Sequence, residues 1–481
     1  MRTEPTPTIA LPDEVSVVNI GLSLFADAVR DQATAVEQVD WRIPADGQLD
    51  LVADLEQLYG PGAADLEEAN SEAVRRLDQS VPLLVDLASA ETIVPGLSGQ
   101  MLLHCGPAVA WPDVCDPLRR SMRAATVAEG WAETVEQADR LLADGMVVLE
   151  PAYLHDTVMP MASAIGPSAP VFAVDNRDGR TRAFAPINQG PGETAWFGRE
   201  TPAAIARLEF LRDVAGPMLH QVLDSSGPID IFALAAQGVQ IGDDVHMRTQ
   251  GTTSLMIRNL LPQIAALPDD GRVALAQFLS GNHLFFLNLA MAGAKSAAMW
   301  AEQVEGSSIV TMMCRNGTSY AIRLAGSDEV FISEAPPVAD AMYYPDYGPE
   351  TSARDIGDSA ILELVGLGGA AAAGSPAVAG FLPGGMSDAV AMTEQMTSIC
   401  ADESTRFKLP TRNYRGTPLG VDVRRVVELD TTPRVTTGIL HASSGVGQVG
   451  AGVATAPIDC FRAALRALAA GESGNDGSRR A

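Results

Sequence analysis

The hydrophobic period of this chain changes twice, and the two changes limit the folds that the sequence can adopt. Up to about residue 160, short apolar runs of β type alternate with segments of helical spacing. Between residues 201 and 300 the spacing is helical, and from residue 309 short strand-like runs return among glycine-rich loops. We therefore predict a multi-domain fold of the α/β plus α+β class, with an N-terminal Rossmann-like α/β unit, a helical subdomain and a C-terminal α+β domain.

The same pattern places the boundaries of the predicted domains. We expect an α/β domain at residues 1–160, a hairpin connection at 161–200, a helical subdomain at 201–305, an α+β domain at 306–470 and a disordered tail at 471–481. The hairpin prediction rests on two apolar runs, 171–174 and 182–186, on either side of an Asp178-Gly179 turn. The β-α-β pattern at residues 15–39 carries one glycine instead of the three of a dinucleotide fingerprint, so it indicates a structural unit more than a cofactor site.

The composition limits the partners and the compartment. A formal net charge of -27 opposes binding to nucleic acid and to anionic membrane surfaces. Residues 1–7 lack the basic and apolar regions of a signal peptide, and the uncharged run 364–387 is too rich in glycine for a membrane span. The five cysteines include no CxxC pair, which is typical of a reducing compartment and excludes a cysteine zinc ribbon. We expect a cytoplasmic protein.

The second half of the chain repeatedly places Arg, Asn, Asp and His next to glycine. Such clusters occur at residues 242–248, 315–317, 355–359, 366–369, 414–418 and 445–452. Glycine lets the backbone approach a ligand closely, and the neighbouring side chains then reach the same space. We interpret the clusters as parts of one polar site that recognises a small anion, although the stretch 445–452 is more typical of a close-packed turn.

The cluster at residues 243–248 combines acidic, imidazole and guanidinium groups. In a helix, Asp244 and Arg248 would share one face, and so would Asp243 and His246. One interpretation makes His246 a general acid or base and Arg248 an anion clamp. A second is a helix start with acidic residues at the positive end of its dipole. A third is a metal site of Asp243, Asp244 and His246, but no second histidine follows at the spacing that zinc motifs use.

The remaining clusters supply further donors for an anion. Arg315 follows a buried strand-like run, where a fixed guanidinium suits a phosphate or a carboxylate; the alternative is a tight turn with a solvated arginine. Asp358 lies in a loop that could orient the arginines or bind a cation. The residues predicted to bind substrate or anion are Arg248, Asn316, Gly317, Asp358, Ser359, Gly368, Gly369, Arg415 and Gly416.

In this order, the clusters resemble a bacterial family whose members are AllG-type subunits of oxamate carbamoyltransferase. The matching stretches are residues 18–22, 39–41, 242–248, 285–292, 315–317, 355–359, 415–422 and the glycine loop from 445. The resemblance covers roughly residues 15–470. The sequence departs from the family near residues 153–156, where only His155 remains of an expected histidine-rich run.

The resemblance implies reversible transfer of a carbamoyl group between phosphate and the amide nitrogen of oxamate, in purine nitrogen breakdown. It also implies an FdrA-like companion subunit and small anionic substrates (carbamoyl phosphate, oxamate or oxalurate). We further expect an oligomer, and we predict no cofactor and no metal-binding residues. With this chemistry, His246 accepts a proton, Arg315 binds the carbamoyl donor, and Asp244 completes the catalytic group. The alternatives are a non-catalytic assembly subunit and a metal-dependent amide or ring-opening hydrolase.

Overall fold

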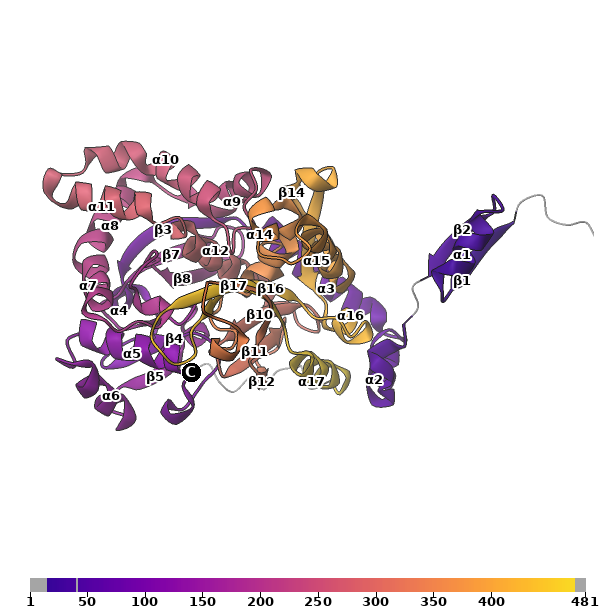
Figure 1. Ribbon diagram of the computed structural model, residues 1–481, viewed down its shortest axis with the longest axis horizontal. Helices are drawn as coiled ribbons and strands as arrows, with labels where there is room; N and C mark the ends of the chain where they lie inside the picture. The colour runs from indigo at the N-terminus through magenta and orange to yellow at the C-terminus, as the bar shows by residue number, and fades with distance from the viewer. Residues whose placement is uncertain (1–14, 40–41, 472–481) are drawn as a thin grey trace, which may run out of the picture.

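The structure is a computed structural model that describes residues 15–39 and 42–471. The predictions for residues 1–14, for the Asp40-Trp41 pair and for the tail from residue 472 lie outside the described residues. The described residues form a mixed α/β fold with several small sheets, as the alternation of periods predicts (Figure 1).

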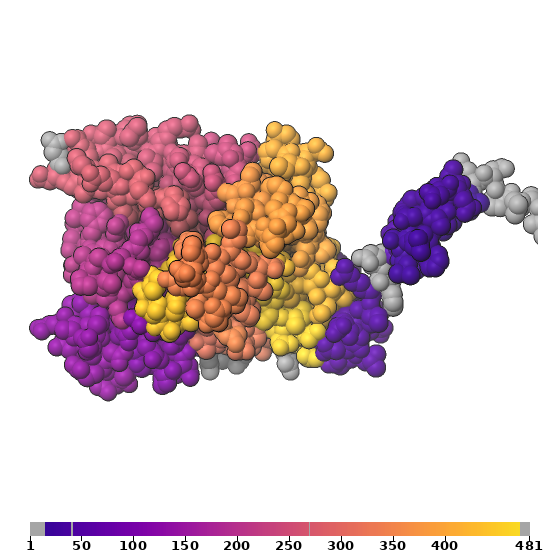
Figure 2. Space-filling model, in the orientation of Figure 1, coloured from indigo at the N-terminus to yellow at the C-terminus, as the bar shows by residue number. Residues whose placement is uncertain are grey.

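The N-terminal β-α-β unit stands apart from the rest of the described chain (Figures 1 and 2). It consists of β1 (Ser16–Ile20), α1 (Ser23–Arg30) and β2 (Ala35–Val39), and its two strands are parallel. The predicted β-α-β pattern is therefore confirmed. Among the described strands, β1 and β2 pair only with each other.

The next part of the chain builds two sheets flanked by helices. The strands of the first sheet are, in order, β8 (Arg182–Pro186), β7 (Pro170–Asn176), β3 (Pro82–Ser89) and β9 (Ile229–Asp230). The strands of the second sheet are, in order, β5 (Val148–Pro151), β4 (Met101–His104) and β6 (Ala164–Ile165). The helices are α2 (Leu49–Leu58), α3 (Ala63–Gln79), α4 (Ala90–Ile93), α5 (Asp116–Ala128) and α6 (Val135–Ala143). The antiparallel β7–β8 hairpin confirms the predicted turn. Because β3 pairs with β7, the first sheet draws strands from both sides of residue 160, and the domain division there stays a prediction.

Residues 202–301 are almost entirely helical, as their period predicts. The helices are α7 (Pro202–Phe210), α8 (Gly216–Ser226), α9 (Ile231–Gln240), α10 (Gln250–Ala266), α11 (Asp269–Gly281) and α12 (Phe285–Ala301). Nearly every residue of α12 is buried, because it packs against β7, β8 and α3. In the described chain, no single helix is long and apolar enough for a membrane span, although α11 and α12 would pass by length and composition as one pair bent by 76°.

The C-terminal part combines three antiparallel sheets with short helices. The sheets are β10-β11-β12 (Val310–Arg315, Ser319–Leu324, Phe331–Glu334), β13-β17-β16 (Val338–Tyr343, Gln448–Thr455, Arg434–Leu440) and β14-β15 (Cys400–Leu409, Arg415–Val421). The helices are α13 (Ile361–Leu364), α14 (Pro376–Ala379), α15 (Met386–Ile399), α16 (Val423–Glu428) and α17 (Ile458–Ala469). The expectation of a turn over all of residues 445–452 is wrong, since β17 begins at Gln448. Gly452 suits this central strand, because a Cβ there would overlap the carbonyl oxygen of Asp340 on β13.

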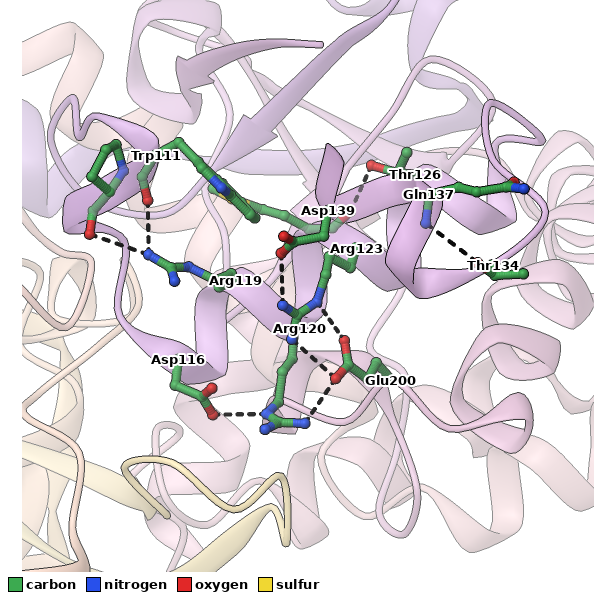
Figure 3. Close-up of polar contacts among 12 residues, drawn as sticks. Trp111, Asp116, Arg119, Arg120, Arg123, Thr126, Thr134, Gln137, Asp139 and Glu200 are labelled. Atoms are coloured by element: carbon green, nitrogen blue, oxygen red, sulfur yellow. Dashed lines mark hydrogen bonds and ion pairs between the residues drawn. The ribbon is translucent and has the colours of Figure 1, made fainter. Parts of the chain in front are cut away.

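A network of ion pairs fixes the start of α7 against α5 and α6 (Figure 3). The carboxylate of Glu200 accepts from Arg120 Nη1 and from Arg123 Nε, each at 2.7 Å. Arg123 also reaches Asp139 of α6 at 2.8 Å. Thr201 then caps α7, with its hydroxyl accepting from the backbone N–H of Ala204 at 3.2 Å. The side chains of α7 therefore project from a well-anchored helix.

Candidate functional site: a buried histidine–glutamate pair

The segment that carries His246 is an irregular loop between α9 and α10, not a helix. Val245 is buried in this loop with a φ of 62°, a left-handed conformation that a β-branched residue rarely adopts. The carboxylate of Asp244 holds the loop by accepting from the backbone N–H groups of His246 (3.1 Å), Met247 (3.3 Å) and Arg248 (2.7 Å). The expectation of shared helical faces is therefore wrong, because the side chain of Asp244 replaces helical hydrogen bonds with local ones.

Asp243 has a different role from its neighbour. Its carboxylate accepts from the backbone N–H groups of Gly251 (3.2 Å) and Thr252 (2.6 Å) and from the Thr252 hydroxyl (2.7 Å). Burial raises the pKa of Asp243, and the hydrogen bonds from Thr252 oppose this rise. Asp243 thus satisfies free N–H groups in the first turn of α10, which agrees with the interpretation of an acidic helix start for this one residue.

The central feature of the site is a buried pair formed by His246 and Glu363. Nδ1 of the imidazole lies 2.9 Å from Oε1 of the carboxylate, and the two side chains are 4% and 0% exposed. Among the hydrogen bonds of the described residues, the His246 ring takes part only through Nδ1. An acidic partner on one ring nitrogen fixes the ring and favours the tautomer in which the other nitrogen accepts a proton. This is the arrangement of an oriented general base.

Glu363 lies on the short helix α13, and a glycine loop holds it in place. Besides His246, Oε1 faces the backbone N–H groups of Gly369 at 3.1 Å and Thr436 at 3.3 Å. Gly368 has a φ of 59°, and its N–H donates to the carbonyl oxygen of Asp244 at 2.7 Å. The loop predicted to bind an external anion therefore donates to a carboxylate and a carbonyl of its own chain.

Glu363 is the residue of this pair that the sequence pattern did not indicate. It directly precedes the uncharged run 364–387 and has apolar neighbours on both sides, at Leu362 and Leu364. A lone carboxylate in an apolar stretch is a signal for a buried, paired acid. Oε2 of Glu363 is buried and has no hydrogen-bond partner among residues 15–39 and 42–471, so one acceptor position beside the His246–Glu363 pair stays open.

Arg315 is fully buried at the end of β10 and forms a two-pronged ion pair with Asp355. Nε and Nη2 of the guanidinium lie 2.8 Å from the two carboxylate oxygens, and both side chains have no exposed surface. Burial alone would lower the pKa of Arg315, but Asp355 keeps it above its usual range. The interpretation as a solvated turn arginine is wrong. The predicted anion clamp is not supported either, because an internal carboxylate already occupies the Nε–Nη2 edge of this guanidinium and the whole side chain is buried.

Asp358 joins the loop 355–359 to the N-terminal part of the chain. Its carboxylate accepts from the N–H groups of Gly106 (2.7 Å) and Met159 (2.9 Å). Burial raises the pKa of Asp358 to about 7, although these two hydrogen bonds oppose the rise. Ser359 is also buried, and it begins the turn into α13. Only four residues separate Asp358 from Glu363, so the same segment connects the Arg315 cluster with the histidine pair.

Asn316 and Gly317 form a tight turn that packs against the N-terminal part of the chain. The Asn316 amide donates to the carbonyl oxygen of Pro107 at 2.8 Å, and its Oδ1 accepts from the N–H of Ser319 at 2.7 Å. A Cβ on Gly317 would lie 2.6 Å from the sulfur of Cys115. Both residues are therefore occupied by contacts within the chain.

Arg415 lies outside this cluster. It is exposed at the start of β15 and pairs with Glu403 on the neighbouring strand β14. Gly416 is buried there, where a Cβ would overlap the carbonyl oxygen of Ser404. The prediction that the arginine clusters form one polar site for an anion is not supported for Arg315 and Arg415, because Arg315 has no exposed surface and Arg415 is exposed beside Glu403. Arg248, whose side chain is 41% exposed and lies 3.4 Å from Asp243, is the accessible arginine of the His246 loop.

Within the described residues, no three His, Cys, Asp or Glu side chains are grouped as a metal site requires. The acids of the His246 loop instead face backbone N–H donors. Among these residues, no ligand cluster supports the alternative of a metal-dependent amide or ring-opening hydrolase.

Three comparisons with known proteins give consistent results. The profile of the family described as oxamate carbamoyltransferase subunit AllG matches residues 147–359. The oxamate carbamoyltransferase subunit AllG of Escherichia coli K12 is 36% identical over 407 residues, which is 84% of this chain and 97% of that protein. The uncharacterized protein YahG of the same organism is 32% identical over 455 residues, covering 94% of this chain and 96% of the relative.

One solved structure also matches closely. A crystal structure of a conserved protein of unknown function from Enterococcus faecalis V583 superposes with a TM-score of 0.82 at 31% identity. The match covers 84% of this chain and 98% of that chain. At the level of class, these matches define a carbamoyltransferase-related subunit. The chain belongs to the AllG family, which confirms the resemblance drawn from its sequence.

Proposed function

We propose that this chain is the subunit of an oxamate carbamoyltransferase-like enzyme that supplies the general base for carbamoyl transfer. The observation that supports this proposal is the buried His246–Glu363 pair, in which Nδ1 faces a carboxylate and Nε2 takes part in no hydrogen bond among the described residues. The printed name of the E. coli relative, a subunit of oxamate carbamoyltransferase, supports the same reaction class and the need for companion subunits. An FdrA-like protein is the companion that we propose, in a cytoplasmic assembly.

In the proposed reaction, His246 accepts and returns one proton. The amide nitrogen of oxamate attacks the carbonyl carbon of carbamoyl phosphate, and Nε2 of His246 accepts the proton that this nitrogen loses. The new C–N bond forms while the bond between the carbonyl carbon and the phosphate oxygen breaks, so the products are oxalurate and phosphate. In the reverse direction, the imidazolium returns the proton to the leaving nitrogen. Glu363 stabilises the imidazolium, because a carboxylate beside Nδ1 favours the charged ring.

Arg248 is the proposed binding residue for the anionic end of a substrate. It lies two residues after His246, and its guanidinium is partly accessible. We assign Arg315 a positioning role instead of the clamp predicted from the sequence. Its pair with Asp355 fixes the segment that leads to Glu363. Asp244 is also a positioning residue, since it holds the backbone of the His246 loop.

The experiment measures phosphate-dependent cleavage of oxalurate by the purified chain together with its companion subunit. We expect His246→Ala to lower turnover by about 10²- to 10⁴-fold, the typical effect of a lost general base. The matched control is His220→Ala, because His220 is exposed on α8 and is paired with Asp86. Turnover close to the wild-type value for His246→Ala would show that another group is the base.

A second pair of variants tests the anion-binding residue. We expect Arg248→Met to raise the KM for phosphate with a smaller effect on turnover, because a ground-state contact is lost. Arg354→Met is the control, since its side chain is 44% exposed and also pairs with a carboxylate, that of Glu334 at 2.7 Å. An unchanged KM in Arg248→Met would place the phosphate elsewhere.

The alternative of a non-catalytic assembly subunit is favoured by one observation, the burial of His246, which is only 4% exposed in this chain. If this alternative holds, both His246→Ala and Arg248→Met leave turnover and KM unchanged while the assembly with the companion subunit stays intact. The same assay therefore separates the two functions.

A further inference from the structure

A surface hollow lies between α7 and α11, away from the contacts that hold the histidine–glutamate pair. Its volume is about 560 Å³, which falls within the roughly 300–1,000 Å³ of small-molecule sites. The walls are mainly alanine and phenylalanine side chains, and the rim includes the loop at Gly190 and Pro191. Figure 1 shows α7 and α11 on the same side of the molecule. The rings of Phe210 and Phe278 meet edge to face there, with centroids 5.6 Å apart.

Arg207 lines this hollow without a carboxylate partner among the described residues. Its guanidinium lies over the rings of Phe278 and Phe210, at 5.5 Å and 5.9 Å from their centroids. Burial lowers the pKa of Arg207, and no acidic group opposes this effect. By contrast, Arg120 and Arg123 near the start of α7 are both paired with Glu200. In a chain with 60 acidic and 33 basic residues, a partly buried arginine with no acid beside it indicates a position kept for an anion from outside.

The rim beside Arg207 is held rigidly. Gly190 has a φ of 77°, and its N–H donates to Oδ1 of Asn188 at 2.9 Å. The carbonyl oxygen of Gly190 accepts from the indole of Trp196 at 2.9 Å, and the amide of Asn282 donates to the carbonyl oxygen of Asn188 at 2.9 Å. Because these groups are fixed before a ligand arrives, binding requires little ordering of the protein.

We propose that the hollow between α7 and α11 binds a small organic anion, whose carboxylate or phosphate group pairs with Arg207 and whose apolar body lies against the alanine and phenylalanine walls. The planar guanidinium supplies two parallel N–H donors to either group. The phenylalanine rings hold the guanidinium in place through cation–π contacts and shield it from water. The size of the hollow favours an anion with an attached apolar group over a bare inorganic ion. The proposal does not depend on the function proposed for the histidine–glutamate pair.

Isothermal titration of the full chain tests this site with three probes: benzoate, phenyl phosphate and inorganic phosphate. We expect at least one of the two aromatic anions to bind, and to bind at least several-fold more tightly than inorganic phosphate. Binding of benzoate alone would identify a carboxylate site, and binding of phenyl phosphate alone a phosphate site. Arg207→Met keeps the apolar stem and should weaken the aromatic anion at least tenfold. Arg177→Met, in the exposed turn between β7 and β8, should leave binding unchanged.

Two further variants make the test independent of the arginine change. Ala203→Phe fills the hollow from the exposed face of α7 without altering a charge, so it should also abolish binding. Arg248→Met should retain binding, because Arg248 belongs to the loop of His246. The proposal is overturned if neither aromatic anion binds the wild-type chain at millimolar concentration, or if Arg207→Met and Ala203→Phe bind it normally. It is equally overturned if only Arg248→Met loses the aromatic anion, or if inorganic phosphate binds as tightly as phenyl phosphate in Arg248→Met as well as in the wild type.

Discussion

Replacing Glu363 by Gln removes the negative charge beside Nδ1 of His246 and keeps the size and shape of the side chain. In the structure, Oε1 of Glu363 faces three donors: the imidazole at 2.9 Å and the backbone N–H groups of Gly369 and Thr436 at 3.1 Å and 3.3 Å. Gln retains an acceptor oxygen for these donors, so we expect the fold to survive the exchange. The exchange removes the stabilisation that the carboxylate gives to a charged imidazole.

The magnitude follows from the change in hydrogen-bond type. A hydrogen bond to a charged group contributes about 1.5–3 kcal/mol, and a neutral one about 0.5–1.5 kcal/mol. The difference between these ranges, about 1–1.5 kcal/mol, acts on the protonated ring and corresponds to a loss of about 5- to 13-fold in rate. If the Gln side chain instead presents its NH₂ group to Nδ1, the ring adopts the wrong tautomer, and the loss approaches the ~10⁴-fold seen when a triad carboxylate becomes an amide.

The assay is phosphate-dependent cleavage of oxalurate with the companion subunit, followed over pH, with thermal unfolding as the check on folding. A residue that tunes the imidazole should change the pH profile of turnover, whereas a purely structural residue changes only the amount of active protein. The double variant with His246→Ala should be no slower than His246→Ala alone, because the two side chains act as one unit. A Glu363→Gln variant with wild-type turnover and an unchanged pH profile would refute the assignment of Glu363 as the partner of a base.

Three further predictions concern the residues around this pair. Arg315→Met leaves the buried carboxylate of Asp355 unpaired, so we expect a loss of about 3–5 kcal/mol in the free energy of unfolding; a loss below about 1 kcal/mol in denaturant titration would contradict the buried pair. The pKa of Asp358 is raised to about 7, so between pH 4 and 7 the native state holds more of this proton than the unfolded state. Its contribution to stability therefore falls as pH rises, by at most about 1.4 kcal/mol per unit. The stability of the wild type relative to Asp358→Asn should decline from pH 5 to pH 7.5, and a flat difference would contradict the shift. Gly368→Ala should lower both stability and turnover, because the new Cβ would overlap Oε1 of Glu363 at a φ of 59°; normal values in thermal unfolding and in the turnover assay would show that the loop adapts.

The sequence alone determined the local elements of this protein. The β-α-β unit lies within residues 15–39 as predicted, and strands β7 and β8 cover the predicted apolar runs 171–174 and 182–186. The helices α7 to α12 lie in the stretch of helical spacing. Local elements follow from spacing within a short window, because side chains on one face of a helix or strand repeat at a fixed period. The family was also predicted from the sequence, because each of its motifs occupies a few consecutive residues and the order of the motifs is visible along the chain.

Only the tertiary structure decided which polar groups meet. Glu363 reaches His246 across 117 residues of sequence, and no local period relates them. The three arginines of the glycine-containing clusters have three different environments: Arg315 is buried against Asp355, Arg415 is exposed beside Glu403, and Arg248 is accessible near His246. The physical reason is that burial and charge pairing depend on contacts between distant segments. The sequence therefore shows which residues are polar, while the packing of the whole chain decides whether a polar residue supports the fold, lies on the surface or belongs to the site.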